Sequence, residues 1–112
     1  MSTDDPPSSS HLEIEPIDGG LRVVGEVDLS NIERFSDAVL GAARPGEELV
    51  VDLAGCEYLG SEGIGVLIEA WKVVREDGRL ILRSPGRTMR RVLELAGLGT
   101  FPNLDIPQEK AG

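Results

Sequence analysis

Short segments with the apolar pattern of β-strands are followed in turn by segments with the apolar pattern of α-helices. This order of strand-like and helix-like segments restricts the fold more than any other feature of the sequence. Segment 12–15 alternates apolar and polar residues, which is typical of a half-buried strand, and segment 21–27 is predicted to be its partner strand. Between them, Asp18-Gly19-Gly20 favours a hairpin turn, because these residues tolerate a positive φ. Segments 49–53 and 80–82 are short and almost continuously apolar, which predicts buried strands, the first of them central and covered on both faces.

Three segments with helical periodicity separate these strands. Ser30 precedes Glu33 by three residues, which predicts a capping box at the start of a helix that ends before Pro45-Gly46. A second helix is predicted from near Ser61 to Asp77-Gly78, and a third is followed by Gly97 as its C′ residue. Their apolar stripes are Ile32, Phe35, Val39 and Ala42; Ile64, Leu67, Ile68, Trp71 and Val74; and Met89, Val92, Leu93 and Ala96.

The order of elements predicts an α/β domain. Each strand–helix–strand step favours a right-handed crossover between parallel neighbours, and the opening hairpin adds an antiparallel strand. We expect a mixed sheet of four to five strands with helices packed against it, the last strand being a short one within 101–106. The expected boundaries are a disordered leader 1–10, one domain 11–107 and a tail 108–112. The predicted core is Leu12, Ile14, Val23, Phe35, Val39, Val51, Leu53, Leu67, Trp71, Leu82, Val92 and Leu93.

Composition excludes several classes of function. A net charge of −9 argues against nucleic acid, which needs clustered Lys and Arg, and is compatible with a basic protein partner. A single cysteine, Cys56, permits no internal disulfide. No apolar run approaches the roughly 20 residues that span a bilayer, and the N-terminus does not resemble a secretory signal. We therefore expect a cytoplasmic protein without direct membrane insertion.

Catalytic patterns are not supported by the sequence. His11 is the only histidine and lies at the edge of the leader, so a Ser–His pair has no second member. Leu59 stands where a Gly-x-Ser-x-Gly nucleophile elbow needs glycine, and Ile68 stands where Gly-x-Gly-x-x-Gly needs its third glycine. Acidic residues show no metal-ligand spacing. We expect no enzyme, no cofactor and no metal.

The junction from Tyr58 to Gly65 is the most unusual segment. It places Gly63 and Gly65 inside the first turn of the second helix, where each glycine costs up to about 1 kcal/mol relative to alanine. A fold accepts that cost where something must approach the backbone closely. Two interpretations remain: the glycines serve a recognition surface, or they let the helix pack tightly on the sheet, with Ser61 as a plain N-cap and Glu62 answering the helix dipole.

Five short motifs follow one another along the chain: Gly25-Glu26-Val27-Asp28 and the segments 49–53, 61–65, 78–80 and 95–98. In order and spacing they resemble the STAS domains of bacterial anti-anti-sigma factors, in which a similar Gly-Glu-Leu-Asp motif follows the second strand. The resemblance extends over about Leu12 to Asp105. It implies a protein that regulates transcription by partner switching.

The resemblance also implies a partner and a switch. In such anti-sigma factor antagonists the junction reads Asp-Ser-Ser/Thr-Gly-x-Gly, and the second hydroxyl residue is phosphorylated by an anti-sigma factor that is a serine kinase of the GHKL ATPase type. The unphosphorylated STAS domain binds that kinase and the phosphorylated one releases it. A phosphoserine adds about −1.5 to −2 charge in the middle of the contact surface.

This chain departs from the pattern at the switch. The family's Asp falls on Gly60, its first Ser on Ser61 and its phospho-acceptor on Glu62, which no serine kinase can phosphorylate. Three consequences are open: a phosphorylated-like state with weak kinase binding, constitutive binding to a partner that accepts Glu62, or Ser61 as a displaced phosphosite. We prefer the second, because a permanently silent domain would have little use.

The expected partner-binding surface joins two segments. One is the start of the second helix, with Gly60, Ser61, Glu62, Gly63 and Gly65; the other is the loop from Asp28 to Asn31, with Ser30, and Glu69 and Lys72 extend the surface along the helix. The alternative function is a non-switching STAS subunit of a larger complex, such as the cytoplasmic ATPase of a transporter.

Overall fold

The computed structural model describes residues 11–107, so the predicted leader and tail lie outside the described part. The elements are β1 (Leu12–Ile17), β2 (Gly20–Val27), α1 (Ile32–Ala42), β3 (Glu48–Leu59), α2 (Ser61–Val74), β4 (Arg79–Arg83), α3 (Arg87–Leu95), a short 3-10 helix (Leu98–Thr100) and β5 (Leu104–Asp105). The strands form one sheet in the order β1-β2-β3-β4-β5. β1 is antiparallel to β2 and the other neighbours are parallel, so the predicted mixed α/β architecture is confirmed.

The opening hairpin forms where the sequence predicts it. β1 ends at Ile17 and β2 begins at Gly20, and Gly19 adopts φ +82° in the turn. Glycine reaches this left-handed region without the steric cost that a Cβ would add. β3 lies at the centre of the sheet as predicted, but its twelve residues extend well past the apolar segment 49–53, because its second half pairs with the end of β2.

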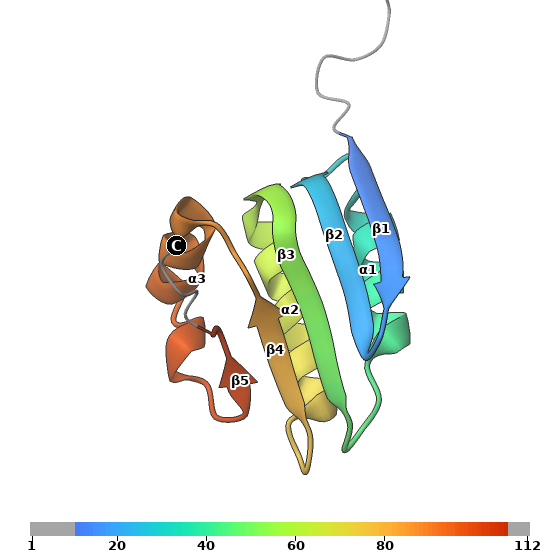
Figure 1. The fold of residues 1–112 in the computed structure, drawn as a ribbon, viewed down its shortest axis with the longest axis vertical. Coiled ribbons are helices and arrows are strands. Elements are labelled where there is room, and N and C mark those ends of the chain that lie inside the picture. The colour runs from blue at the N-terminus through green and yellow to red at the C-terminus, as the bar shows by residue number, and fades with distance from the viewer. Residues whose placement is uncertain (1–10, 108–112) are drawn as a thin grey trace, which may run out of the picture.

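The core lies between the sheet and the helix pair α1 and α2, which sits behind the sheet in Figure 1. Alternate residues of the strands point toward the helices, because successive side chains of a strand face opposite sides. The fully buried side chains that fill this layer include Val23, Val51, Leu53, Leu80 and Leu82 from the sheet and Phe35, Val39, Leu67 and Val74 from the helices. Burial of this apolar layer is the main stabilising contribution to the fold.

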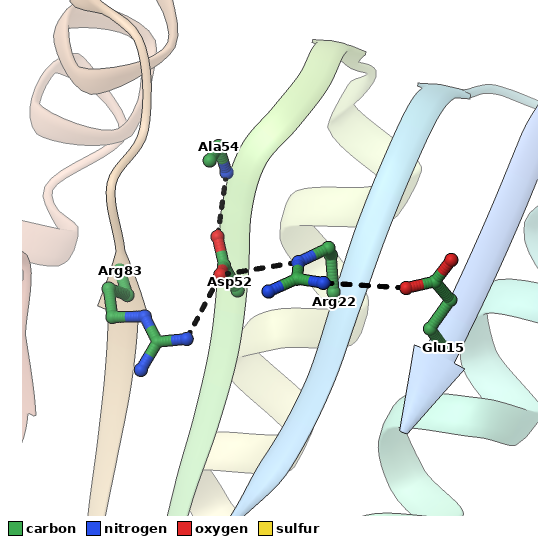
Figure 2. A network of polar contacts seen from close by, with 5 residues as sticks. All are labelled: Glu15, Arg22, Asp52, Ala54 and Arg83. Carbon is green, nitrogen blue, oxygen red and sulfur yellow. Dashed lines mark hydrogen bonds and ion pairs between the residues drawn. The ribbon is translucent and has the colours of Figure 1, made fainter. Parts of the chain in front are cut away.

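β3 was expected to be an apolar central strand covered on both faces, and the structure corrects this: α1 and α2 cover one face, and polar side chains of the sheet cover the other. Arg22 on β2, Asp52 on β3 and Arg83 on β4 lie side by side across the strands, and Glu15 on β1 completes the row (Figure 2). The Asp52 side chain is only 8% exposed, because the two arginine side chains lie over it. β3 is therefore shielded on this side by polar side chains of its own sheet.

Three predicted details of the helices are wrong. α1 begins at Ile32 with Asn31 as its N-cap, so Ser30 and Glu33 form no capping box. Gly60, not Ser61, is the N-cap of α2. On α3 only Met89 and Leu93 are buried, whereas Val92 is 37% exposed and Ala96 is exposed, because α3 lies beside β4 and β5 at the end of the sheet and is covered along a narrower stripe. Gly97 has φ +90°, as predicted for a C′ residue.

The C-terminal segment is fixed by the aromatic residue of α2. The Trp71 indole N–H donates a hydrogen bond to the Pro102 carbonyl at 2.7 Å, and its ring lies 4.7 Å from that of Phe101. These contacts bring β5 against β4, so the predicted short last strand is confirmed at Leu104–Asp105.

Candidate functional site

Parallel strands deliver the candidate site to one edge of the sheet. β2, β3 and β4 run in the same direction, so the loop after β2 and the start of α2 after β3 lie next to each other. The Gly60 N–H donates to the Val27 carbonyl at 3.0 Å and ties the two segments together. We call the loop 28–31, the helix start 60–65 and Tyr58 the docking corner.

The loop of the docking corner is held by Asn31, a residue that sequence reasoning named only as the end of the loop. Its side chain accepts a hydrogen bond from the Asp28 N–H at 3.0 Å and donates to the Glu26 carbonyl at 2.9 Å, and the residue is buried. Asp28 in turn accepts from the Ser30 N–H at 2.9 Å and from the Ser30 hydroxyl at 2.6 Å. The side-chain bonds fix a tight loop that leaves Leu29 72% exposed. An Asn directly before a helical pattern was the available signal for this role.

The two glycines of the helix start have different causes. A Cβ on Gly63 would lie 2.4 Å from Leu59 Cδ1 and 3.1 Å from Val27 Cγ1, so glycine lets α2 approach the strand ends. A Cβ on Gly65 would meet nothing within 4 Å, and Gly65 is exposed. Packing therefore explains Gly63 and leaves Gly65 without a structural requirement.

Alanine substitutions are expected to separate these two glycines. Gly63→Ala should lower the free energy of unfolding by about 1–3 kcal/mol, because Leu59 and Val27 are buried and have little room to move. Gly65→Ala should raise it by about 0.5–1 kcal/mol, because alanine is the better helix residue. Urea unfolding followed by circular dichroism measures both, and a stabilising Gly63→Ala would contradict the packing argument.

The Glu62 carboxylate lies where a side chain at position 60 would be. A Cβ on Gly60 would lie 2.9 Å from Glu62 Oε1 and 3.4 Å from the Tyr58 hydroxyl, so both side chains gather over the glycine. Gly60 has φ −72° and ψ 173°, which any residue can adopt, so its backbone does not demand glycine. The absent side chain at position 60 therefore provides the room that the Glu62 carboxylate uses.

The structure places the predicted site residues as follows. Asp28, Leu29, Ser30, Tyr58 and Glu62 line one shallow hollow. Ser61, Glu62 and Gly65 are exposed and Gly63 is buried. Glu69 and Lys72 lie further along α2 and pair with each other at 3.4 Å. Leu29 and Tyr58, 72% and 54% exposed, are apolar members of the surface that sequence reasoning named only as parts of the segments 28–31 and 58–65.

The remaining chemical groups are engaged in structure. Cys56 is buried, and burial raises the pKa of its thiol to about 11, so the thiolate is scarce at neutral pH. His11 is exposed and lies 3.2 Å from Glu13. Within residues 11–107, His, Cys, Asp and Glu side chains form no group of three that could hold a metal ion. In that same range, no helix has the length and apolar character needed to cross a membrane.

Comparison with known proteins assigns the family. The family model described as Mlab, STAS domain, matches residues 10–106. The chain belongs to the STAS domain family. The anti-sigma F factor antagonist of Lysinibacillus sphaericus is 29% identical to this STAS domain over 94 residues, which are 81% of this chain and 80% of the relative. The anti-sigma-B factor antagonist of Bacillus subtilis is 23% identical over 90 residues, 80% and 83% of the two chains.

A solved structure has the same fold as this STAS domain. The crystal structure of an anti-sigma factor antagonist from Mycobacterium paratuberculosis superposes with a TM-score of 0.68 at 27% identity, covering 91% of this chain and 90% of that one. The resemblance that the motifs indicated, from Leu12 to Asp105, therefore extends to the whole described fold.

Proposed function

We propose that this STAS domain is an anti-sigma factor antagonist that binds a GHKL-type anti-sigma factor through the docking corner. Its similarity to named anti-sigma factor antagonists over four-fifths of their length supports the class of function. The single observation that carries the surface is Gly65, an exposed glycine at the start of the second turn of α2 that no internal contact requires. A backbone kept bare at a helix start leaves room for close approach of a partner.

The surroundings of Gly65 have the composition of a protein interface. Exposed Leu29 and Tyr58 offer apolar area beside the carboxylates of Asp28 and Glu62. Aromatic side chains are enriched in interfaces, and carboxylates pair with Arg or Lys of a partner through charge-assisted hydrogen bonds. We therefore propose that Glu62 is a permanent contact to a basic group of the anti-sigma factor, in place of a phosphorylation switch.

The position of the Glu62 carboxylate over Gly60 supports this role. The family pattern has an acid at the position of Gly60 and a hydroxyl at that of Glu62; here the acid stands two residues later and overlies the vacated position. One negative charge is thus retained over the helix start, where the helix dipole favours it. Ser61, as first residue of α2, remains the displaced phosphosite to be tested.

The test compares four proteins against the GHKL-type kinases of the source genome: wild type, Glu62→Gln, Glu62→Ser, and Gly60→Asp with Glu62→Ser. We expect wild type to bind in the presence of ATP without incorporating phosphate. Glu62→Gln should bind about tenfold more weakly, because the amide keeps the shape and loses the charge. Calorimetry measures the affinity of each variant for the kinase, and mass spectrometry measures the phosphate that each variant incorporates.

The two serine variants test the switch. Glu62→Ser should gain phosphate, and the double variant, with the full family pattern, should gain it faster. If wild type binds no kinase while Glu62→Ser does, Glu62 mimics a phosphate and the proposed constitutive contact is wrong. Phosphate on wild-type Ser61, removed by Ser61→Ala, would also overturn it. If the wild-type protein co-purifies with transporter ATPase subunits instead of a kinase, the non-switching alternative is favoured.

A further inference from the structure

Basic residues are concentrated in one part of this acidic chain. Residues 79–93 contain five arginines and no acidic residue, although the whole chain has 20 acidic and 11 basic residues. Three of the five are engaged internally: Arg79 pairs with Asp105 at 2.8 Å, Arg83 with Asp52 at 3.0 Å, and Arg90 donates to the Ile106 carbonyl at 3.0 Å. The other two, Arg87 and Arg91, are exposed and pair with no side chain of residues 11–107.

The positions of these two arginines are unfavourable for α3 itself. Arg87 is the first residue of the helix, where the dipole favours anions, and the first turn holds no acid. Arg91 follows one turn later on the same side, and like charges at this spacing destabilise a helix. A local arrangement that opposes stability and has no compensating contact is expected at a functional surface.

Apolar side chains accompany the arginines on the outer side of α3. Leu95 follows Arg87 and Arg91 at the same four-residue spacing and is 77% exposed, and Val92 beside them is 37% exposed. We call these four residues the α3 basic face. Exposed apolar side chains flanked by cations are suited to a partner that presents apolar side chains flanked by carboxylates.

Such a complement exists on the same molecule. Leu29 and Tyr58 of the docking corner are exposed and line one hollow with Asp28 and Glu62, and the exposed Glu57 directly precedes Tyr58 at the end of β3. Neither Glu57 nor Glu62 forms an ion pair within residues 11–107. The docking corner therefore has the opposite charge to the α3 basic face, and each of the two surfaces exposes two large hydrophobic side chains.

Topology puts the two surfaces on one edge. β2, β3 and β4 are parallel, so the loop after β2, the start of α2 and the start of α3 follow one another along the edge where these strands end (Figure 1). The edge is therefore acidic at the β2 side and basic at the β4 side. A two-fold rotation that brings two such edges face to face aligns the acidic part of each copy with the basic part of the other.

We propose that this edge mediates a reversible two-fold dimer of the chain, with the α3 basic face of each copy on the docking corner of the other. An anionic lipid surface fits less well, because it would face the carboxylates of the docking corner on the same edge and a chain of net charge −9. A second copy satisfies both parts of the edge at once.

The dimer has a regulatory consequence that rests on the proposed function. It covers the docking corner, so self-association and binding of the anti-sigma factor exclude each other. The dimerisation itself requires neither the kinase nor Glu62 as a kinase contact. Its test is therefore independent of the proposed function.

The experiment measures the mass of the full chain by sedimentation equilibrium at low ionic strength, over concentrations up to about 1 mM, the weak limit of specific association. We expect wild type to form dimers and no larger species, and to dissociate at about 1 M salt, where the Debye length is about 3 Å. Arg87→Glu with Arg91→Glu should weaken dimerisation by about 100-fold or more, because each dimer contains the contact twice. Arg44→Glu with Arg75→Glu, which changes the net charge equally on exposed residues outside this edge, should not weaken it.

Charge exchange gives the decisive result. Glu57→Arg with Glu62→Arg should also abolish self-association, since the two new arginines would face Arg87 and Arg91 of the other copy. Mixed in equal amounts with the Arg87→Glu, Arg91→Glu variant, it should form a heterodimer in which one contact has the native polarity and the other is restored with its polarity reversed. A monomeric wild type, or a mixture that stays monomeric, would overturn the proposal. Binding of phosphatidylserine vesicles that depends on Arg87 and Arg91, without dimers, would assign the face to lipid instead.

Discussion

A Gly25→Ala variant is expected to lose at least about 3 kcal/mol of unfolding free energy, a large part of the roughly 5–15 kcal/mol typical of a domain. Gly25 has φ +106°, a region in which L side chains are strained. A Cβ there would lie 2.1 Å from the His11 carbonyl oxygen. Because the obstacle is backbone, no rotamer change relieves the contact.

The strand pairing around Gly25 prevents the backbone from adjusting. Gly25 pairs with Leu12 of β1 on one side and Cys56 of β3 on the other, and the next N–H, of Glu26, donates to the His11 carbonyl at 2.9 Å. A shift of His11 breaks that bond, and a shift of Gly25 disturbs both ladders. The register irregularity after Gly25 also positions the loop that begins at Asp28.

Urea unfolding measures this loss, with Gly41→Ala as the matched control. Gly41 lies in the last turn of α1, is exposed, and a Cβ there would meet nothing within 4 Å. Alanine at 41 should therefore stabilise by about 0.5–1 kcal/mol. A Gly25→Ala protein within about 0.5 kcal/mol of wild type, the range of neutral surface changes, would show that neither the positive φ nor the nearby His11 carbonyl requires glycine at this position of β2.

Removal of the Asp52 carboxylate should produce the second large effect. Asp52→Ala is expected to lower the unfolding free energy by about 2–3 kcal/mol, because it leaves the guanidinium groups of Arg22 and Arg83 facing each other across β3. It also removes the acceptor of the Ala54 N–H, which bonds to Asp52 Oδ1 at 2.9 Å (Figure 2). Asp52→Asn keeps that acceptor and loses only the charge, so its loss should be smaller.

The same carboxylate should give stability a dependence on acid pH. Burial raises the pKa of Asp52, but the Ala54 hydrogen bond and the guanidinium groups of Arg83 and Arg22 outweigh it and hold the pKa below its ordinary value. The unfolded chain then binds the proton first, so this contribution is complete above the unfolded pKa of about 3.9 and is lost as pH falls through the folded pKa.

Unfolding free energies measured from neutral pH down to about pH 2 test this contribution. The wild-type curve should fall more steeply at the acid end than that of Asp52→Asn, and the two should converge there. Glu15→Ala removes only the exposed end of the row, 3.4 Å from Arg22, and should change stability by less than about 1 kcal/mol. Parallel curves for wild type and Asp52→Asn would contradict a charged, stabilising Asp52.

Local sequence patterns predicted those elements well that depend on residues close to each other in the chain. The Asp18-Gly19-Gly20 turn, the stripe of α2 and the Gly97 cap are all short-range features. The second half of β3 was missed, because Ala54 to Tyr58 contains a glycine and has no alternation. It becomes a strand only by pairing with the end of β2.

The candidate site was located by motif and corrected by geometry. The positions 60–65 and the loop after β2 were named from sequence, and the structure places members of both around one hollow. Ser30 was assigned a cap that belongs to Asn31, since both residue types precede the same helical pattern and only the folded loop distinguishes them. Val92 was predicted to be a core residue because it follows Met89 by three residues, as Leu93 follows it by four. In the structure, the part of α3 that packs against the core is narrower than this apolar stripe and leaves Val92 exposed.

Local sequence patterns predicted the kind and order of the main elements, because periodicity and turn residues act between near neighbours in the chain. Only the tertiary structure decided that Gly63 is needed for packing while Gly65 is open, and that Glu62 overlies Gly60. It alone placed Arg22, Asp52 and Arg83 in contact. These residues are about thirty positions apart, and their contact depends on strand order and register, which follow from burial of the whole core rather than from any local pattern.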